Sequence, residues 1–268
     1  MIKNTLAAAI LLLVTAMNHT LSLAGDAACA PPQRLEMKVL GQQKREQRNF
    51  TQGLEIYRGR LLESTGSYRS KTKLNSVSME GAATVLSETI QEGTFGEGLT
   101  VLNDEIYQST WQNKKMFVFN SEGVFSRTLD FPFIGWGLTN DGKNLITTDG
   151  SHFLRFLNPK DLSVIKTLEI KYLDNTFPSV NELEMVKGKI FGNILLSDEI
   201  VRINPENGCI DGTLDASTLR KLLPPEEIKY LSSDRNFVLN GIAYDSAKDE
   251  FILTGKNWGY LFRVKISN

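Results

Sequence analysis

Histidine is nearly absent from this chain of 268 residues, which contains only two. His19 lies in an N-terminal segment that we expect to be removed, so the mature chain would keep His152 alone. A Ser-His-Asp triad and a zinc site built on imidazole are therefore disfavoured. A single histidine such as His152 is more typical of a surface loop than of a ligand set.

An excess of charge of one sign is also absent. Lys and Arg together number 30 and Asp and Glu 31, which gives a net charge of −1. A protein without a basic surface lacks the attraction that binds nucleic acid or an anionic membrane, so we expect neither as a partner. The apolar fraction of 41% and the charged fraction of 23% are those of an ordinary globular protein.

Residues 1–24 predict a secretory signal peptide rather than part of the fold. Lys3 gives a basic start, residues 6–17 form an uncharged apolar run, and Ser22-Leu23-Ala24 resembles a cleavage site. The alternative, a membrane anchor, would need a longer apolar run. We therefore expect a secreted or periplasmic protein, with residues 25–268 forming a single domain that leaves the membrane once the signal is removed.

The chain has only two cysteines, Cys29 and Cys209, and both would remain after cleavage of the signal. In an oxidising compartment such a pair predicts one disulfide, which would fasten the new N-terminus to a loop after Pro205. Two free buried thiols are the alternative. Neither cysteine lies in a pattern typical of a nucleophile.

A short motif, a variable residue followed by Gly or Glu and then Leu or Ile, recurs five times at intervals of about 40 to 60 residues. Strand-like segments follow each copy, separated by turn residues such as Asn140-Asp141-Gly142. A repeat of this length with several short strands is typical of propeller blades. The variable position is occupied by Gln52, Glu97, Trp136, Asn181 and Asn240.

These repeats predict an all-β protein, a five-bladed β-propeller with four strands per blade. A fourth strand can be identified in four units, but the last unit ends at Asn268 without one. The strand-like segment 35–40 can supply it, which would close the ring and cover the open sheet edges. A helical insertion at about 215–236 explains the longest interval. We expect it to pack at the periphery, with a lid over the channel as the alternative.

The first strand of each propeller blade lines the central channel, so the five variable residues should form one ring at one end of it. A structural ring would repeat one small or apolar residue, whereas this one holds a carboxylate, three carboxamides and an indole. Such diversity at equivalent positions favours a functional site over a water-filled polar plug. Strand order places further residues at the same rim, namely Phe50, Phe95, Trp111, Lys256 and Trp258.

Together these motifs resemble the plant and bacterial glutamine cyclotransferase family, from about residue 35 to the end of the chain. The motifs include Phe50-Thr51-Gln52-Gly53-Leu54, Glu63-Ser64-Thr65-Gly66, Phe95-Gly96-Glu97-Gly98, Gly135-Trp136-Gly137-Leu138 and Leu239-Asn240-Gly241-Ile242. The resemblance implies a five-bladed propeller that converts N-terminal glutamine to pyroglutamate and releases ammonia. One departure is Leu195, where the family usually has tryptophan.

On this resemblance we expect Glu97, Asn181 and Lys256 to be catalytic, with Glu97 as the proton shuttle. The residues expected to bind the substrate are Phe50, Gln52, Phe95, Trp111, Trp136, Asn240 and Trp258. The partners would be peptides or proteins with N-terminal glutamine, bound by a monomer.

The reaction requires no metal or other cofactor, although a structural calcium ion in the channel is compatible with the oxygen ligands there. Two other functions stay open on the sequence. One is a calcium-dependent propeller hydrolase such as a lactonase, and the other is a non-catalytic propeller that binds peptide ends.

Overall fold

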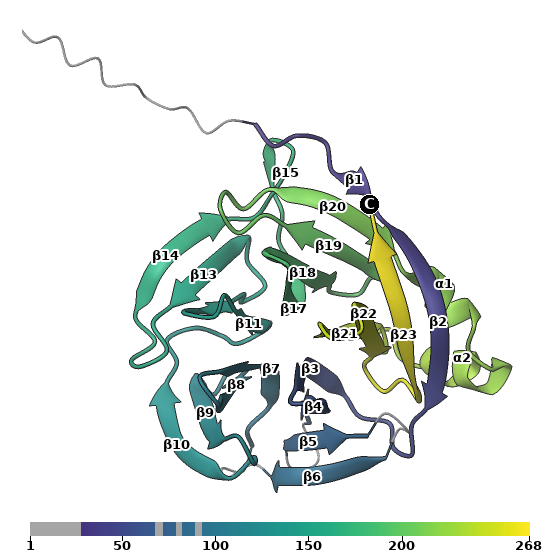
Figure 1. Cartoon of the computed structure of the whole chain (residues 1–268), viewed down its shortest axis with the longest axis horizontal. Helices are drawn as coiled ribbons and strands as arrows, with labels where there is room; N and C mark the ends of the chain where they lie inside the picture. The colour runs from purple at the N-terminus through teal and green to yellow at the C-terminus, as the bar shows by residue number, and fades with distance from the viewer. Residues whose placement is uncertain (1–27, 68–71, 79–81, 89–92) are drawn as a thin grey trace, which may run out of the picture.

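The computed structural model describes residues 28–67, 72–78, 82–88 and 93–268, and it forms five β-sheets arranged around a central channel (Figure 1). The predicted signal peptide lies outside these residues. Within them, no helix has both the length and the apolar character needed to cross a bilayer. The predicted fold class, an all-β five-bladed propeller, is confirmed.

Each blade is an antiparallel meander whose first strand faces the channel. Blade 1 contains β3 (Thr51–Tyr57), β4 (Arg60–Thr65), β5 (Lys73–Val77) and β6 (Ala83–Glu88). Blade 2 contains β7 (Gly96–Leu102), β8 (Glu105–Thr110), β9 (Lys115–Asn120) and β10 (Phe125–Asp130). Blade 3 contains β11 (Leu138–Asn140), β12 (Leu145–Thr147), β13 (Phe153–Leu157) and β14 (Val164–Glu169).

Blade 4 contains β17 (Val180–Val186), β18 (Lys189–Ile194), β19 (Glu199–Ile203) and β20 (Ile210–Asp215). A short hairpin of β15 (Lys171–Tyr172) and β16 (Asn175–Thr176) precedes it. Blade 5 contains β21 (Leu239–Asp245), β22 (Glu250–Gly255) and β23 (Tyr260–Ser267). The outer strand of blade 5 is β2 (Glu36–Lys44), which pairs antiparallel with β23, so the predicted closure by the N-terminal strand is confirmed.

The N-terminal segment also adds something that the repeats do not predict. The two-residue strand β1 (Gln33–Arg34) pairs parallel to β20 and gives blade 4 a fifth strand. Just before it, Cys29 forms the predicted disulfide with Cys209, with a Cα–Cα distance of 5.6 Å. The segment thus joins the outer edges of blades 4 and 5 (Figure 1).

The hydrophobic core lies between the blades rather than within one layer. One cluster, for example, combines Leu62 and Leu74 of blade 1 with Leu99, Ile106 and Phe117 of blade 2. Each blade is covered on both faces by its two neighbours in the ring. This explains why the first strand of a blade is buried along most of its length. The rigid ring of inner strands then fixes where their first residues lie.

Two short helices, α1 (Ser217–Lys221) and α2 (Pro225–Leu231), lie outside blade 5 (Figure 1). Leu219 of α1, Leu231 of α2 and Leu223 between the helices pack on the core. The Arg220 side chain forms an ion pair with Asp198, with the Nε–Oδ2 distance being 2.8 Å. The helices are therefore held against the propeller as a fixed part of its surface.

Candidate active site

A β-bulge interrupts the pairing of the first and second strands in four blades. The register shifts occur between Thr51 and Gly53, Gly96 and Leu99, Val180 and Leu183, and Leu239 and Ile242. A bulge leaves its extra residue outside the ladder and turns the side chain in a new direction. Gln52, Glu97, Asn181 and Asn240 lie at these bulges, and all four are buried.

Glycine follows the variable residue where neighbouring inner strands come closest. A Cβ on Gly98 would lie 2.4 Å from the backbone nitrogen of Leu138, and one on Gly137 would lie 2.0 Å from the backbone oxygen of Asn181. The Gly98 N–H donates to the Trp136 carbonyl at 2.8 Å. The missing side chains therefore let the backbones of Glu97, Trp136 and Asn181 approach one another.

A cavity of about 430 Å³ opens at this end of the channel. Eight residues predicted from the sequence line it: Phe50, Gln52, Phe95, Glu97, Trp111, Trp136, Asn181 and Lys256. Three others complete the lining, namely Leu195, Asp234 and Asn236. The repeats thus bring together residues that are up to about 200 positions apart, as the geometry of a propeller channel requires.

Aromatic edges form a continuous part of the pocket wall. The rings of Phe50 and Phe95 meet edge to face with centroids 6.0 Å apart, and those of Phe95 and Trp111 meet at 6.1 Å. The Lys256 Nζ atom lies 5.5 Å from the Phe50 ring centroid, within the range of a cation–π contact. The pocket is therefore apolar along one wall and carries its charged groups beside it.

Asn240 does not line the pocket but lies behind Gln52. Its Nδ2 donates to the Thr51 carbonyl at 2.9 Å and to Gln52 Oε1 at 3.3 Å. This contact engages the oxygen of the Gln52 amide and leaves its nitrogen as the donor for the pocket. Asn240 therefore orients a pocket residue, where the sequence suggested direct binding.

Trp258 is placed elsewhere than the sequence led us to expect. Its side chain is completely buried in the core beside α1 and α2, and its Nε1 donates to the Phe237 carbonyl at 3.2 Å. Asn257 has a positive φ of 59°, and the turn there directs Lys256 and Trp258 to different surroundings. Trp258 is therefore a core residue and does not line the cavity, where the sequence suggested substrate binding.

The electrostatic centre of the pocket is the pair Glu97 and Lys256. Burial raises the pKa of Glu97 to about 8, although the nearby Lys256 cation acts in the opposite direction. Burial likewise lowers the pKa of Lys256 below its ordinary value, against the attraction of Glu97. Desolvation thus outweighs the mutual attraction in both groups, and Glu97 can hold or release a proton near neutral pH.

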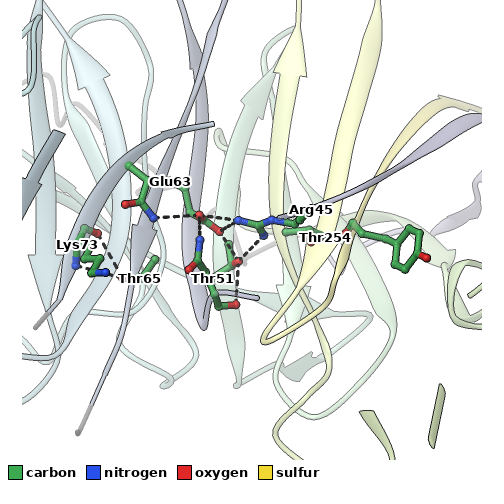
Figure 2. A network of polar contacts seen from close by, with 9 residues as sticks. Arg45, Thr51, Glu63, Thr65, Lys73 and Thr254 are labelled. Carbon is green, nitrogen blue, oxygen red and sulfur yellow. Dashed lines mark hydrogen bonds and ion pairs between the residues drawn. The ribbon is translucent and has the colours of Figure 1, made fainter. Parts of the chain in front are cut away.

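A buried ion pair fixes the loop that carries Phe50. Figure 2 shows the Glu63 carboxylate between Arg45 and Thr51, and it accepts from Arg45 Nη2 at 2.7 Å and from Thr51 Oγ1 at 2.6 Å. Asn49 Nδ2 donates to the same carboxylate at 2.7 Å, while the Asn49 carbonyl accepts from the Asn257 N–H at 2.8 Å. The loop is thereby held between blade 1 and the turn that contains Lys256.

Deeper in the channel lie three glutamates, of which Glu182 and Glu184 are buried and Glu55 is half-buried. Glu182 accepts from the backbone N–H groups of Leu54 at 3.2 Å and Ile242 at 2.9 Å, so it joins β3 to β21. Burial raises the pKa of Glu55 to about 7 and those of Glu182 and Glu184 well above the ordinary value. In the part of the chain that the structure describes, no group of three His, Cys, Asp or Glu side chains is arranged to hold a metal ion.

Sequence reasoning missed Asp234 and Asn236 as pocket residues. They follow α2 and belong to no repeat, so the argument from equivalent positions could not reach them. The Arg45–Glu63 pair was also missed, although a glutamate between Leu62 and the buried end of β4 breaks the apolar pattern of that strand. An isolated charge on a buried strand was the available signal.

Comparisons of the whole chain with known proteins all indicate one family. A family model described as glutamine cyclotransferase matches residues 7–266. A glutaminyl-peptide cyclotransferase from Arabidopsis thaliana is 32% identical over 236 residues, which cover 86% of this chain and 71% of that protein. The crystal structure of Myxococcus xanthus glutaminyl cyclase matches with a TM-score of 0.77 and 28% identity, covering 88% of this chain and 98% of the other.

Proposed function

This chain belongs to the glutamine cyclotransferase family, and we propose that Glu97 is the proton shuttle of its glutaminyl-peptide cyclotransferase activity. In this reaction the α-amine of an N-terminal glutamine attacks the carbonyl carbon of its own side-chain amide. A five-membered lactam forms and ammonia leaves. Nucleophile and electrophile are already tethered, so the enzyme must select the folded rotamer and move protons.

The proton transfers set the chemical requirement. The attacking nitrogen must lose a proton as the new C–N bond forms, and the departing nitrogen must gain one because an amide anion is a very poor leaving group. A single carboxylate can accept the first proton and donate it to the departing nitrogen, ending in its starting state. Glu97 is the buried carboxyl in the wall of the pocket among the residues described.

The observation that carries this assignment is the raised pKa of Glu97, about 8, in a pocket walled by aromatic rings. The α-amine of a peptide in water ordinarily has a pKa of about 7.7–8.0. Two groups with similar proton affinity exchange a proton at little cost in free energy, which suits a group that must act first as base and then as acid.

Polar groups around Glu97 can stabilise the oxyanion of the tetrahedral intermediate. The donors in the wall are the carboxamides of Gln52 and Asn181, the indole N–H groups of Trp111 and Trp136, and the amine of Lys256. One well-aimed donor of this kind typically contributes about 2.7–4 kcal/mol to transition-state stabilisation. We assign Asn181 and Lys256 to this role because they line the same cavity as Glu97.

The test uses a peptide that begins with glutamine and mass spectrometry, which detects the loss of one ammonia per molecule. Glu97→Gln keeps the size and polarity of the side chain but cannot shuttle a proton, so we expect turnover to be abolished. Circular dichroism and thermal unfolding should match the wild type. Near-normal activity in this variant would exclude Glu97 as the shuttle.

We also propose that turnover needs no metal ion, since the tethered reaction requires positioning and proton transfer. A chelator in the same assay should leave the rate unchanged, whereas a calcium-dependent hydrolase would lose activity.

We further propose that the protein works as a monomer in an oxidising compartment outside the cytoplasm. The Cys29–Cys209 disulfide supports that compartment.

A further inference from the structure

The pocket has more room than the reacting residue needs. Its volume of about 430 Å³ lies in the range of cavities that hold ligands larger than one amino acid. The reaction uses the end of the pocket at Glu97, and the peptide must continue from there toward solvent. The residue after glutamine therefore passes along the pocket lining that the reaction does not use, at Leu195, Asp234 and Asn236.

Asp234 presents a carboxylate with one oxygen unengaged. Its Oδ1 accepts from the backbone N–H of Asn236 at 2.8 Å and from Asn236 Nδ2 at 2.9 Å. Within residues 28–67, 72–78, 82–88 and 93–268, no hydrogen bond reaches Oδ2 and no ion pair involves Asp234. The side chain is half-buried, so part of its hydration is already lost.

The segment that carries Asp234 is fixed to the propeller. The Asp234 carbonyl accepts from the Phe237 N–H at 3.0 Å. The Phe237 ring stacks on Tyr230 of α2 with centroids 5.3 Å apart. The next residue, Val238, accepts through its carbonyl from the Lys256 N–H at 2.9 Å. The carboxylate is therefore held in place before a substrate arrives, which lowers the entropic cost of binding.

Nearby cations do not neutralise Asp234. Arg48 is paired with Glu227 and lies over the Tyr230 ring at 4.5 Å, and Arg220 is paired with Asp198. Arg235 is exposed and does not line the cavity, and Lys256 is buried beside Glu97. The pocket lining thus offers a negative charge at Asp234, and Leu195 in the same lining offers an apolar surface.

We propose that Asp234 and Leu195 form a subsite for the second residue of the substrate and that this subsite favours lysine or arginine. The charged end of such a side chain would pair with Asp234 Oδ2, while its aliphatic stem would pack on Leu195. The inference rests on the proposed function, because it assumes that glutamine occupies the position next to Glu97.

The experiment compares three peptides that differ only in the second residue, Gln-Lys, Gln-Ala and Gln-Glu, together with glutamine amide, which has no second residue. At low salt, kcat/KM should fall from Gln-Lys to Gln-Ala to Gln-Glu by about two- to fivefold per step, the size expected of a partly exposed ion pair. Added salt should compress these differences.

The variant Asp234→Asn keeps Oδ1 for the turn and removes the charge. It should bring the three peptides to within about twofold of one another, because the charge that separates them is gone, when each kcat/KM is divided by that of glutamine amide on the same variant. Asp174→Asn is the matched control, since Asp174 is exposed in the β15–β16 hairpin and does not line the pocket. That variant should discriminate among the peptides as the wild type does.

Equal kcat/KM values for the three peptides in the wild type would overturn the subsite, as would discrimination that survives Asp234→Asn. Failure to cyclise any of the peptides would instead contradict the proposed activity. In that case the subsite is tested by peptide affinity. The enzyme is titrated with the same peptides, and the fluorescence of Trp111 and Trp136 reports binding. Equal dissociation constants for Gln-Lys and Gln-Glu would then exclude it.

Discussion

At the scale of single residues, the chemistry depends on how burial and charge oppose each other in one pocket. The sequence could place Glu97 and Asn181 in the pocket because repeats reveal equivalent positions, and it could place Lys256 there from the order of the strands. It could not decide whether Lys256 would lower the pKa of Glu97 by attraction or desolvation would raise it. That balance depends on packing around both groups, and in the structure burial prevails.

The Lys256 cation should shift the pH dependence of the reaction in a defined direction. We expect kcat/KM to rise with pH through about 8 as Glu97 becomes the carboxylate that accepts the proton. Lys256→Met removes an attraction that lowers the pKa of Glu97, so the rising limb should move to higher pH. Rates measured from about pH 6 to pH 10 locate that limb.

The α-amine of the substrate titrates in the same range, but equally for both enzymes, so the difference between the two profiles reports Glu97. An unchanged limb in Lys256→Met would mean that the lysine does not act on the charge of Glu97. Thermal unfolding of both proteins serves as the control for a general loss of structure.

At the scale of elements, the bulges and turns decide where these side chains point. The strands could be predicted from their alternating pattern and from the turn residues between them. The sequence also predicted that the first residues of the inner strands meet at one end of the channel. The two-residue strands β1 and β15 could not, because two residues carry no periodicity. The location of Trp258 also escaped prediction, since it depends on the left-handed residue Asn257 and not on strand parity.

The loop between β2 and β3 depends on the charge of Glu63 (Figure 2). Burial alone would raise its pKa, but the Arg45 cation and the donors around the carboxylate hold the pKa of Glu63 below the ordinary value. Glu63→Gln leaves Arg45 buried without its partner, which typically costs about 3–5 kcal/mol of unfolding free energy. Urea unfolding at neutral pH measures the loss.

A group with a lowered pKa stabilises the fold above its unfolded pKa, and that stabilisation is lost as the pH falls through the folded value. The stability difference between wild type and Glu63→Gln should therefore shrink in acid. The double variant Arg45→Met with Glu63→Gln removes the unpaired charge and should recover part of the stability. A single variant as stable as the wild type would contradict this account.

At the scale of the whole molecule, the ring is closed by segments far apart in the sequence. The number of blades and the pairing of the two ends could be predicted because open sheet edges have to be covered. The disulfide could be predicted from the cysteine count and the oxidising compartment that the predicted signal peptide implies. The extra pairing of β1 with β20 could not be predicted, because it follows from how the segment between Cys29 and β2 crosses blade 4.

Removal of the disulfide by the double variant Cys29→Ser with Cys209→Ser should lower the unfolding free energy by about 2–4 kcal/mol, the usual contribution of such a cross-link. The two cysteines are 180 residues apart in sequence, and neither lines the pocket. Turnover of a glutamine peptide at 25 °C should therefore be unchanged. Wild-type protein treated with a thiol reductant should give the same unfolding curve as the double variant. If the double variant instead unfolds like the untreated wild type, the disulfide has no stabilising role.

The pairing of β2 with β23 has a consequence for how the protein is made. A ribosome produces β2 first and its partner near the end of translation, so during synthesis the earliest strand has nowhere to dock. The circle of sheets can join only after nearly the whole polypeptide has been released.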